Sequence, residues 1–153
     1  LIADEPTTAL DVTIQAQILE LMGDLKSNYD MSIMMITHDL GVIAEVSDRV
    51  AVMYASKIVE YTDVTTLFED PMHPYTCGLI GSIPRIENEV KRLEAIPGIV
   101  PNPLDLEEGC KFNSRCQFAD EKCRAREPEI EEINPGHLVR CWHFGKLKQE
   151  KTV

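Results

Sequence analysis

Two short apolar runs, each ending in polar side chains suited to catalysis, constrain this chain more than any other feature. Residues Leu1–Ala3 lead directly into two adjacent carboxylates, Asp4 and Glu5, and the β-branched, methionine-rich run Ser32–Thr37 leads into His38. Apolar runs of this length are typical of buried parallel strands. We therefore expect both runs to be strands of an α/β sheet, each presenting its polar residues where the strand ends.

Helical periodicity and capping residues account for most of the remaining chain up to residue 70. Asp11 is the predicted N-cap of a helix that runs to about Asn28, and Asp39 is the predicted cap of a second helix. The other predicted elements are the strands Arg49–Ala55 and Lys57–Tyr61, joined as a hairpin at Ser56, and a short helix Asp63–Phe68. Strand, helix, strand and helix followed by a hairpin indicate the second half of an α/β sheet.

Frequent prolines change the character of the chain after residue 70. One helix is predicted over Tyr75–Ile83, with Pro74 at its first position, and a helical turn or two over Glu87–Glu94. From Pro97 to Cys141 we expect loops and turns with too little apolar surface to fold unaided. Unlike His38, the residues His73, His137 and His143 do not follow an apolar run, and they are expected to be surface or loop residues.

Composition and charge exclude several classes of function. The chain has a formal net charge of −11, which disfavours nucleic acid as a partner, although residues 109–126 form a local basic island. The apolar runs are too short to span a membrane and no signal peptide is present, so membrane association is expected to depend on a protein partner.

The residues around the first carboxylate pair resemble those of an ABC transporter ATPase. Asp-Glu-Pro-Thr-Thr-Ala-Leu-Asp, at residues 4–11, is similar to a Walker B motif followed by a D-loop, and Thr-His-Asp, at residues 37–39, is similar to the H-loop. The resemblance implies that Asp4 holds Mg²⁺ and that Glu5 polarises the attacking water. It also implies that His38 contacts the γ-phosphate of ATP and that Asp11 lies in the loop that meets a second subunit.

The motifs that grip the nucleotide phosphates are missing from these 153 residues. No G-x-x-x-x-G-K-[ST] segment occurs, and the ABC signature segment is absent too. We therefore expect this chain to be the later part of an ATPase, the second half of a P-loop nucleotidase sheet with a loop-rich appendage, and to be inactive alone.

Four of the five cysteines lie close together in the sequence. Cys110, Cys116, Cys123 and Cys141 have the spacing C-x5-C-x6-C-x17-C, whereas Cys77 stands apart and is interpreted as a structural thiol. Disulfides are disfavoured in the reducing cytosol where the ATPase motifs place the chain. Unliganded thiols remain an alternative, but a metal site would supply folding free energy that the weak core lacks. A [4Fe–4S] cluster is favoured over zinc because no tight C-x2-4-C knuckle occurs.

Nearby arginines add to the case for a cluster. Arg115, Arg124, Arg126 and Arg140 would offset the negative charge of a four-thiolate cluster.

A finer resemblance covers almost all of residues 1–145. The segments that carry it are His73-Pro74-Tyr75-Thr76, Pro97-Gly98-x-Val100-Pro101, Gly109-Cys110-x-Phe112-x-x-Arg115-Cys116 and Val139-Arg140-Cys141. They are similar to the C-terminal region of oligopeptide/dipeptide ABC transporter ATP-binding subunits. This similarity implies two parts, residues 1–70 from the ATPase domain and residues 71–153 with the cysteine site, and it implies an iron–sulfur cluster at the four cysteines. Ser56 departs from the family, which usually has glycine there.

The resemblance implies a set of partners and a location. A second ABC ATPase subunit would complete the ATP sites, transmembrane permease subunits would anchor the pair at the cytoplasmic face of the membrane, and an extracytoplasmic peptide-binding protein would deliver the cargo. Two alternatives remain open from the sequence. One is a metal- or iron–sulfur-binding module on a vestigial ATPase scaffold, and the other is an importer of nickel or another small solute.

Overall fold

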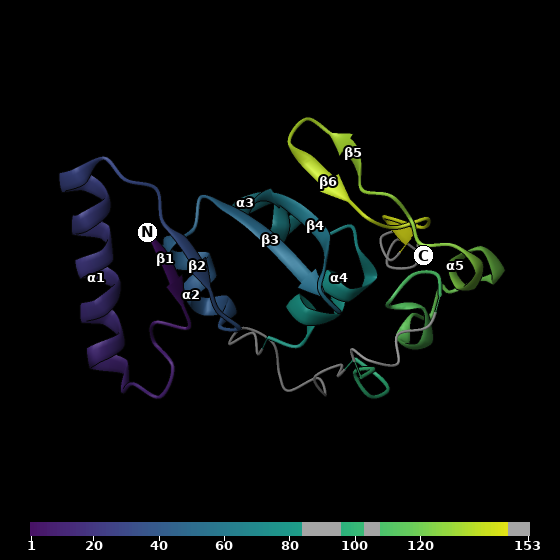
Figure 1. The fold of residues 1–153 in the computed structure, drawn as a ribbon, viewed down its shortest axis with the longest axis horizontal. Coiled ribbons are helices and arrows are strands. Elements are labelled where there is room, and N and C mark those ends of the chain that lie inside the picture. The colour runs from purple at the N-terminus through teal and green to yellow at the C-terminus, as the bar shows by residue number, and fades with distance from the viewer. Residues whose placement is uncertain (84–95, 103–107, 147–153) are drawn as a thin grey trace. The chain divides into compact units, whose positions relative to one another are not determined.

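The structure is a computed structural model that describes residues 1–83, 96–102 and 108–146. The chain separates into two compact units, Leu1–Ser47 and Asp48–Val153, each of which is described by itself (Figure 1). The helical turn expected over Glu87–Glu94 lies outside the described residues.

The first unit contains two parallel strands and two helices in alternation. The elements are β1 (Ile2–Asp4), α1 (Val12–Tyr29), β2 (Met34–Ile36) and α2 (Leu40–Val46). The two strands pair in parallel, with Asp4 opposite Ile36. This order confirms the predicted mixed α/β arrangement of the first 47 residues.

Aspartate side chains cap the N-termini of both helices, at the positions that the sequence predicted. Asp11 accepts a hydrogen bond from the backbone N–H of Ile14 at 2.9 Å, and Asp39 accepts from those of Gly41 and Val42 at 2.8 and 3.3 Å. These bonds satisfy N–H groups that have no partner within the helix. Asp30 ends α1 in the left-handed conformation, with a φ of 48°.

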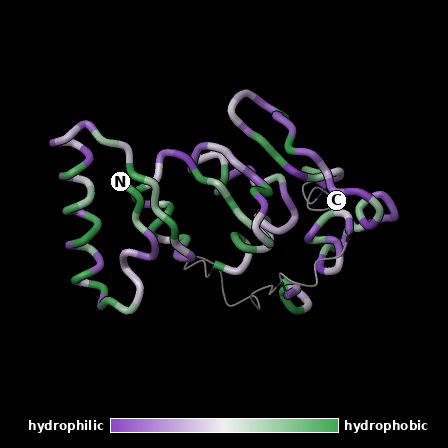
Figure 2. Tube along the Cα trace, viewed as in Figure 1, coloured by the Kyte–Doolittle hydropathy of each residue, from purple (hydrophilic) through white to green (hydrophobic). Residues whose placement is uncertain are grey.

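The expectation that the first strands are buried is wrong for this structure. Ile2 is 69% exposed, Met34 55% and Ile36 48%. The physical reason is that β1 and β2 form a sheet of only two strands among the described residues, so their apolar side chains lack neighbours. Figure 2 shows hydrophobic residues along β1, β2 and α1.

The second unit is built on an antiparallel sheet of four strands in the order β3-β4-β6-β5. Its elements are β3 (Arg49–Tyr54), β4 (Lys57–Asp63), α3 (Val64–Glu69), α4 (Pro74–Gly81), the 3₁₀ turn η1 (Asn113–Arg115), α5 (Glu121–Ala125), β5 (Glu131–Asn134) and β6 (His137–Val139). The predicted hairpin is confirmed. Ala55 and Ser56 join its strands with φ values of 46° and 62°, the left-handed geometry of a tight hairpin turn that favours glycine.

Regular structure after Pro97 corrects the expectation of loops alone. A helix, a 3₁₀ turn and a second hairpin occur there, and β6 adds to the first hairpin by pairing Val139 with Glu60 and Leu138 with Tyr61. The pairing explains how a segment poor in apolar residues folds: it extends a sheet that already exists and shares its core. Val139 is 1% exposed as a result.

An aromatic cluster links this sheet to the segment that carries the first cysteines. The ring of Tyr54 on β3 lies 4.8 Å from that of Tyr75 on α4 and 5.2 Å from that of Phe112, between centroids. Phe112 follows Cys110 by two residues and is 3% exposed. Aromatic packing therefore fixes the start of the cysteine segment against the sheet.

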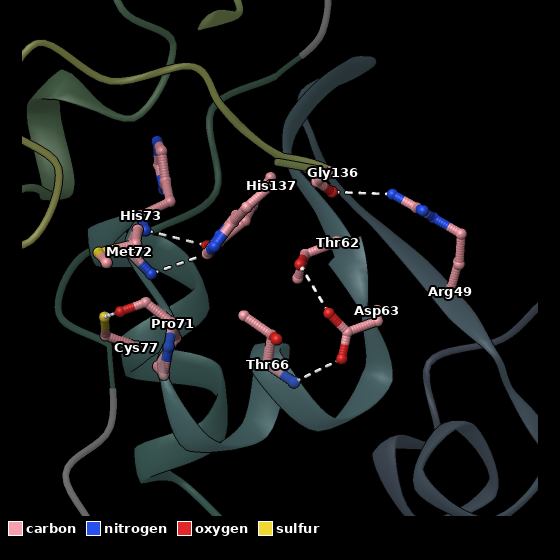
Figure 3. A network of polar contacts seen from close by, with 11 residues as sticks. Arg49, Thr62, Asp63, Thr66, Pro71, Met72, His73, Cys77, Gly136 and His137 are labelled. Carbon is pink, nitrogen blue, oxygen red and sulfur yellow. Dashed lines mark hydrogen bonds and ion pairs between the residues drawn. The ribbon is translucent and has the colours of Figure 1, made fainter. Parts of the chain in front are cut away.

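A buried carboxylate holds three parts of the second unit together, and Figure 3 labels Met72, His73 and His137, which donate hydrogen bonds to it. Glu60 on β4 is fully buried and accepts hydrogen bonds from the backbone N–H groups of Met72 and His73 at 2.8 and 2.9 Å. It also accepts one from Nε2 of His137 on β6 at 2.7 Å. Three donors on one carboxylate satisfy a charge that would otherwise be costly to bury.

Two of the histidines expected to be surface or loop residues are buried. His73 is 1% exposed and His137 is 2% exposed. His73 begins α4, because its Nδ1 accepts the N–H of Tyr75 at 3.0 Å. His143 is half-buried and lies in the turn after β6.

The change from the first compact unit to the second falls after Ser47, whereas the sequence changes character at residue 70. The division into residues 1–70 and 71–153, drawn from family resemblance, stays a prediction. Among the described residues, no helix has both the length and the apolar character needed to cross a membrane.

Candidate functional site

The ends of β1 and β2 bring a carboxylate and an imidazole into direct contact. The strands run in parallel, so their carboxyl ends lie at the same edge, and the backbone N–H of Glu5 donates to the carbonyl of Ile36 at 2.8 Å. From this edge Oε1 of Glu5 lies 3.1 Å from Nδ1 of His38. Residues separated by 32 others in the sequence thus meet as a pair that faces solvent.

Glu5 is held in an unusual conformation by its neighbours. Its φ is 45°, in the left-handed region that side chains with a Cβ rarely occupy, and Pro6 follows it. The hydroxyl of Thr8 donates to Oε2 of Glu5 at 2.8 Å. This bond, with a smaller contribution from His38, lowers the pKa of Glu5, so the carboxylate is ionised at neutral pH. Strained backbone of this kind is often found at functional sites.

The other two predicted residues, Asp4 and Asp11, differ in their positions and roles. Asp4 is the exposed last residue of β1. Asp11 begins α1, and its carboxylate is engaged in capping that helix. The structure therefore joins Glu5 with His38 directly, and it gives Asp11 a structural role in the unit as described.

The four clustered cysteines line one cavity in the second unit. Cys110, Cys116, Cys123 and Cys141 surround it together with aromatic and polar side chains that include Phe112, Trp142 and His143. The cavity itself is small, with about 10 Å³ of space for a water-sized sphere. Cys77 does not line the cavity; it lies on α4, where its thiol contacts the carbonyl oxygen of Pro71 at 3.3 Å (Figure 3).

Close backbone packing sets the spacing of two of these cysteines. The N–H of Cys110 donates to the carbonyl of Cys123 at 2.8 Å. Gly109, with a φ of 80°, makes this approach possible, because a Cβ there would lie 2.4 Å from the carbonyl oxygens of Cys123 and Arg124. Glycine is required here by both conformation and space.

Burial raises the pKa of all four thiols, and to about 12 for Cys141. Repulsion from neighbouring thiolates raises the pKa of Cys110, Cys116 and Cys141 further. The backbone N–H of His143 lies 3.3 Å from Sγ of Cys141 and acts in the opposite direction. Thiols gathered in this way are protonated at neutral pH unless a cation compensates their charge.

Two of the arginines expected to offset the charge of a cluster also tie segments of the second unit together. Arg115 donates to the carbonyls of Ile96 and Pro97, and Arg140 donates to those of Ile58 and Pro128. These bonds make them structural ties. Lys146, which the sequence did not single out, is the cation whose charge lowers the pKa of Cys116 and Cys123.

Two further residues beside the cavity were also missed. Asp120 begins α5 by accepting the N–H of Cys123 at 3.0 Å, and its second oxygen lies 2.7 Å from Nε2 of His143. Trp142, the only tryptophan of the chain, lies under the ammonium group of Lys122 at 3.6 Å from the ring centroid. A carboxylate three residues before a cysteine could have been noticed in the sequence, but nothing pointed to the pairing with His143.

Comparison with known proteins gives consistent matches. Residues 59–123 match the family described as the oligopeptide/dipeptide transporter, C-terminal region. The oligopeptide transport ATP-binding protein AppD of Bacillus subtilis is 54% identical over 152 residues, which are 99% of this chain and 46% of that protein. The oligopeptide transport ATP-binding protein OppD of Haemophilus influenzae is 51% identical over 142 residues, 93% of this chain and 44% of that protein.

The same pattern holds in a further species. OppD of Salmonella typhimurium is 49% identical over 142 residues, again 93% of this chain, and 42% of that protein is covered. The chain therefore spans less than half the length of the curated relatives named here. Along nearly its whole length the chain is similar to oligopeptide transport ATP-binding proteins, and its residues 59–123 match the C-terminal region of oligopeptide/dipeptide transporters.

Proposed function

We propose that this chain is part of an ATP-hydrolysing subunit that energises import of oligopeptides or dipeptides. The names of its relatives supply the cargo class and the use of ATP. The observation that carries the proposal is the contact of Glu5 with His38 at the shared carboxyl edge of two parallel strands. A carboxylate that accepts protons beside an imidazole that donates hydrogen bonds is a suitable pair for phosphoryl transfer to water.

Each residue at this edge has a proposed role. Asp4 would hold Mg²⁺, which would neutralise phosphate charge when bound. Glu5 orients the attacking water and accepts its proton, and the hydrogen bond from Thr8 keeps the acceptor oxygens aligned. His38 contacts the terminal phosphate. Asp11, at the start of α1, belongs to the loop that reaches the opposite subunit.

The complete ATP site requires more than these 153 residues, because they contain no phosphate-binding loop. The proposed assembly pairs the subunit with a second ABC ATPase subunit. The pair would bind transmembrane permease subunits at the cytoplasmic face of the membrane, and an extracytoplasmic peptide-binding protein would deliver cargo to them. Within the chain, residues 1–70 would complete the ATPase domain and residues 71–153 would form the family's C-terminal region.

The four cysteines are proposed to hold a [4Fe–4S] cluster, with zinc as the alternative ion. Support comes from their arrangement around a single cavity and from the need for a cation among buried thiols. Anaerobically purified protein should contain about four irons and four sulfides per chain, the composition of a cubane cluster. Colourless protein with one zinc would replace the cluster by a zinc site, and protein with neither metal would contradict the metal site.

Transport provides the test of the proposed function. The complete transporter, reconstituted in vesicles with its binding protein, should take up labelled oligopeptide only when ATP is supplied on the side of the ATPase subunits. His38→Ala should reduce uptake at least about tenfold, as expected when a group at a phosphoryl-transfer site is lost. Uptake that is independent of ATP, or the same for His38→Ala and the parent protein, would contradict the proposal.

A further inference from the structure

The imidazole of His38 is held at the candidate site by very few contacts. Its side chain is 78% exposed, and the contact of Nδ1 with Oε1 of Glu5 at 3.1 Å is its one hydrogen bond within the described residues. An exposed side chain with one partner is not fixed by packing, since few neighbouring atoms limit its rotamers. The position of the ring therefore depends on how firmly the backbone at residue 38 is held.

That backbone belongs to a connection of three residues between a strand and a helix. β2 ends at Ile36 and α2 begins at Leu40, so His38 is the middle residue of the connection. The strand side is anchored by the N–H of Glu5, which donates to the carbonyl of Ile36 at 2.8 Å. Connections of this kind are usually more mobile than the elements they join, so other bonds are needed to fix residue 38.

The side chains of Thr37 and Asp39 supply those bonds on both sides of His38. The hydroxyl oxygen of Thr37 accepts the backbone N–H of Asp39 at 3.1 Å, which closes a turn with His38 at its centre. The carboxylate of Asp39 in turn accepts the N–H groups of Gly41 and Val42 at 2.8 and 3.3 Å. The two side chains connect the end of β2 to the first turn of α2, and we call them the Thr37–Asp39 bracket.

The first turn of α2 leaves room for this carboxylate. A Cβ atom at Gly41 would lie 3.1 Å from Oδ1 of Asp39, which is closer than an ordinary van der Waals contact. Glycine is otherwise a poor residue for a helix. Its presence here lets Asp39 lie close against the backbone of α2, and a larger residue would push the carboxylate away.

We infer that Thr37 and Asp39 are positioning residues that fix the imidazole of His38 between Glu5 and the terminal phosphate of ATP. The inference rests on the proposed function, in which His38 contacts that phosphate. Both bracket residues act through the backbone at residue 38 and not through a phosphate contact of their own. A small displacement of a group at a reacting centre lowers turnover strongly. The alternative is that Asp39 is an ordinary helix cap, which stabilises α2 without influence on catalysis.

The test measures ATP hydrolysis by the complete subunit. Asp39→Ala removes the acceptor and should lower kcat about fivefold, because conformations with a displaced ring become populated when the cap is lost. Asp39→Asn keeps a capping oxygen and should retain at least about half of the parent kcat. Thr37→Val keeps the shape of the side chain without its hydroxyl and should lower kcat about threefold, whereas Thr37→Ser should restore it.

A double-mutant cycle separates positioning from stability. In a subunit that carries His38→Ala, adding Asp39→Ala should change kcat by less than about twofold, because no imidazole is left to position. The same fivefold loss in both backgrounds would overturn the inference.

Another helix cap provides the matched control. Asp63 caps α3 in the second unit by accepting the N–H of Thr66 at 2.9 Å. Asp63→Ala should leave kcat within about twofold of the parent value, because it removes a cap of the same kind away from His38. Equal losses of kcat for Asp39→Ala and Asp63→Ala would assign Asp39 a purely structural role and overturn the inference.

The outcomes also distinguish this inference from the proposed function. Hydrolysis at the parent rate by His38→Ala would overturn the proposed role of His38 and the inference with it. Slow hydrolysis by His38→Ala, together with parent rates for Asp39→Ala and Thr37→Val, would overturn the inference alone. If Asp39→Ala does not fold, the comparison of Thr37→Val with Thr37→Ser decides, and equal rates for these two variants would overturn the inference.

Discussion

Removing the buried carboxylate of Glu60 should destabilise the second unit severely. Glu60→Ala leaves the N–H groups of Met72 and His73 and the Nε2 of His137 without their acceptor. Each unsatisfied buried donor costs about 1 to 3 kcal/mol, so we expect the three donors together to cost about 3 to 5 kcal/mol once the site has relaxed. That loss would be a large part of the stability of a domain of this size.

Urea unfolding followed by the fluorescence of Trp142 measures this effect, because the only tryptophan of the chain lies in the second unit. At slopes of about 1 to 3 kcal/mol per molar urea, the midpoint should fall by roughly 1 to 5 M. Glu60→Gln preserves size but turns amide hydrogens toward donors, and we expect a smaller loss of about 2 kcal/mol.

The matched control is Glu131→Ala on β5 of the same sheet. Glu131 is exposed, and its removal should change the free energy of unfolding by less than about 0.5 kcal/mol. Equal midpoints for Glu60→Ala and Glu131→Ala would refute the claim that this network holds β4, β6 and the start of α4 together.

Other predictions address the cysteine site, acid stability and nucleotide binding. Gly109→Ala should destabilise the second unit by about 2 kcal/mol or more and lower its metal content, because its Cβ would meet the carbonyls of Cys123 and Arg124. The control Gly23→Ala, in open space on α1, should be neutral or stabilise by up to about 1 kcal/mol. Burial lowers the pKa of His73 to about 4 from an ordinary 6.5, so the folded state binds fewer protons than the unfolded state between these values. The free energy of unfolding of the metal-free chain should therefore be highest above pH 6.5 and should fall by about 3 kcal/mol as the pH drops to 4. His73→Asn keeps a capping acceptor but cannot be protonated, so urea titrations at several pH values should show that this decrease is lost. The chain alone should show no micromolar ATP binding by calorimetry, since its 153 residues include no phosphate-binding loop, and micromolar affinity would contradict that reading.

Local signals in the sequence predicted the helices before residue 84 well, whereas α5 was missed. Asp11, Asp39 and Asp63 each stand before a helical pattern, and each caps a helix through its carboxylate. The physical signal is short in range, because the capping side chain and the N–H groups it accepts are two or three residues apart.

Pairings between distant segments were not predictable in the same way. His137–Val139 is too short to show strand periodicity, and its place in the sheet depends on register with β4. From the sequence alone, Glu60 would be expected to face solvent on its strand. In the structure it is buried because His137 and the turn at Met72 contact it. The clustering of four cysteines was visible from their spacing in the sequence, whereas the contact of Asp120 with His143 depends on tertiary folding.

The contact of Glu5 with His38 could be predicted in part from the sequence. The sequence placed both residues at strand ends, and parallel pairing then required them to share an edge. The left-handed backbone of Glu5 and its bond from Thr8 had no such signal. Their roles in catalysis stay predictions.

The most direct measurement of the central claim is the rate of ATP hydrolysis by the complete subunit carrying Glu5→Gln, with ATP affinity measured on the same protein. Replacing the carboxylate by an amide removes the proton acceptor while keeping its size, so turnover should fall by about 100-fold or more with ATP affinity within about twofold of the parent protein. The matched variant Glu20→Gln, at an exposed position of α1, should hydrolyse ATP at the parent rate. Hydrolysis by Glu5→Gln at the rate of Glu20→Gln would contradict the assignment of Glu5 as the catalytic base.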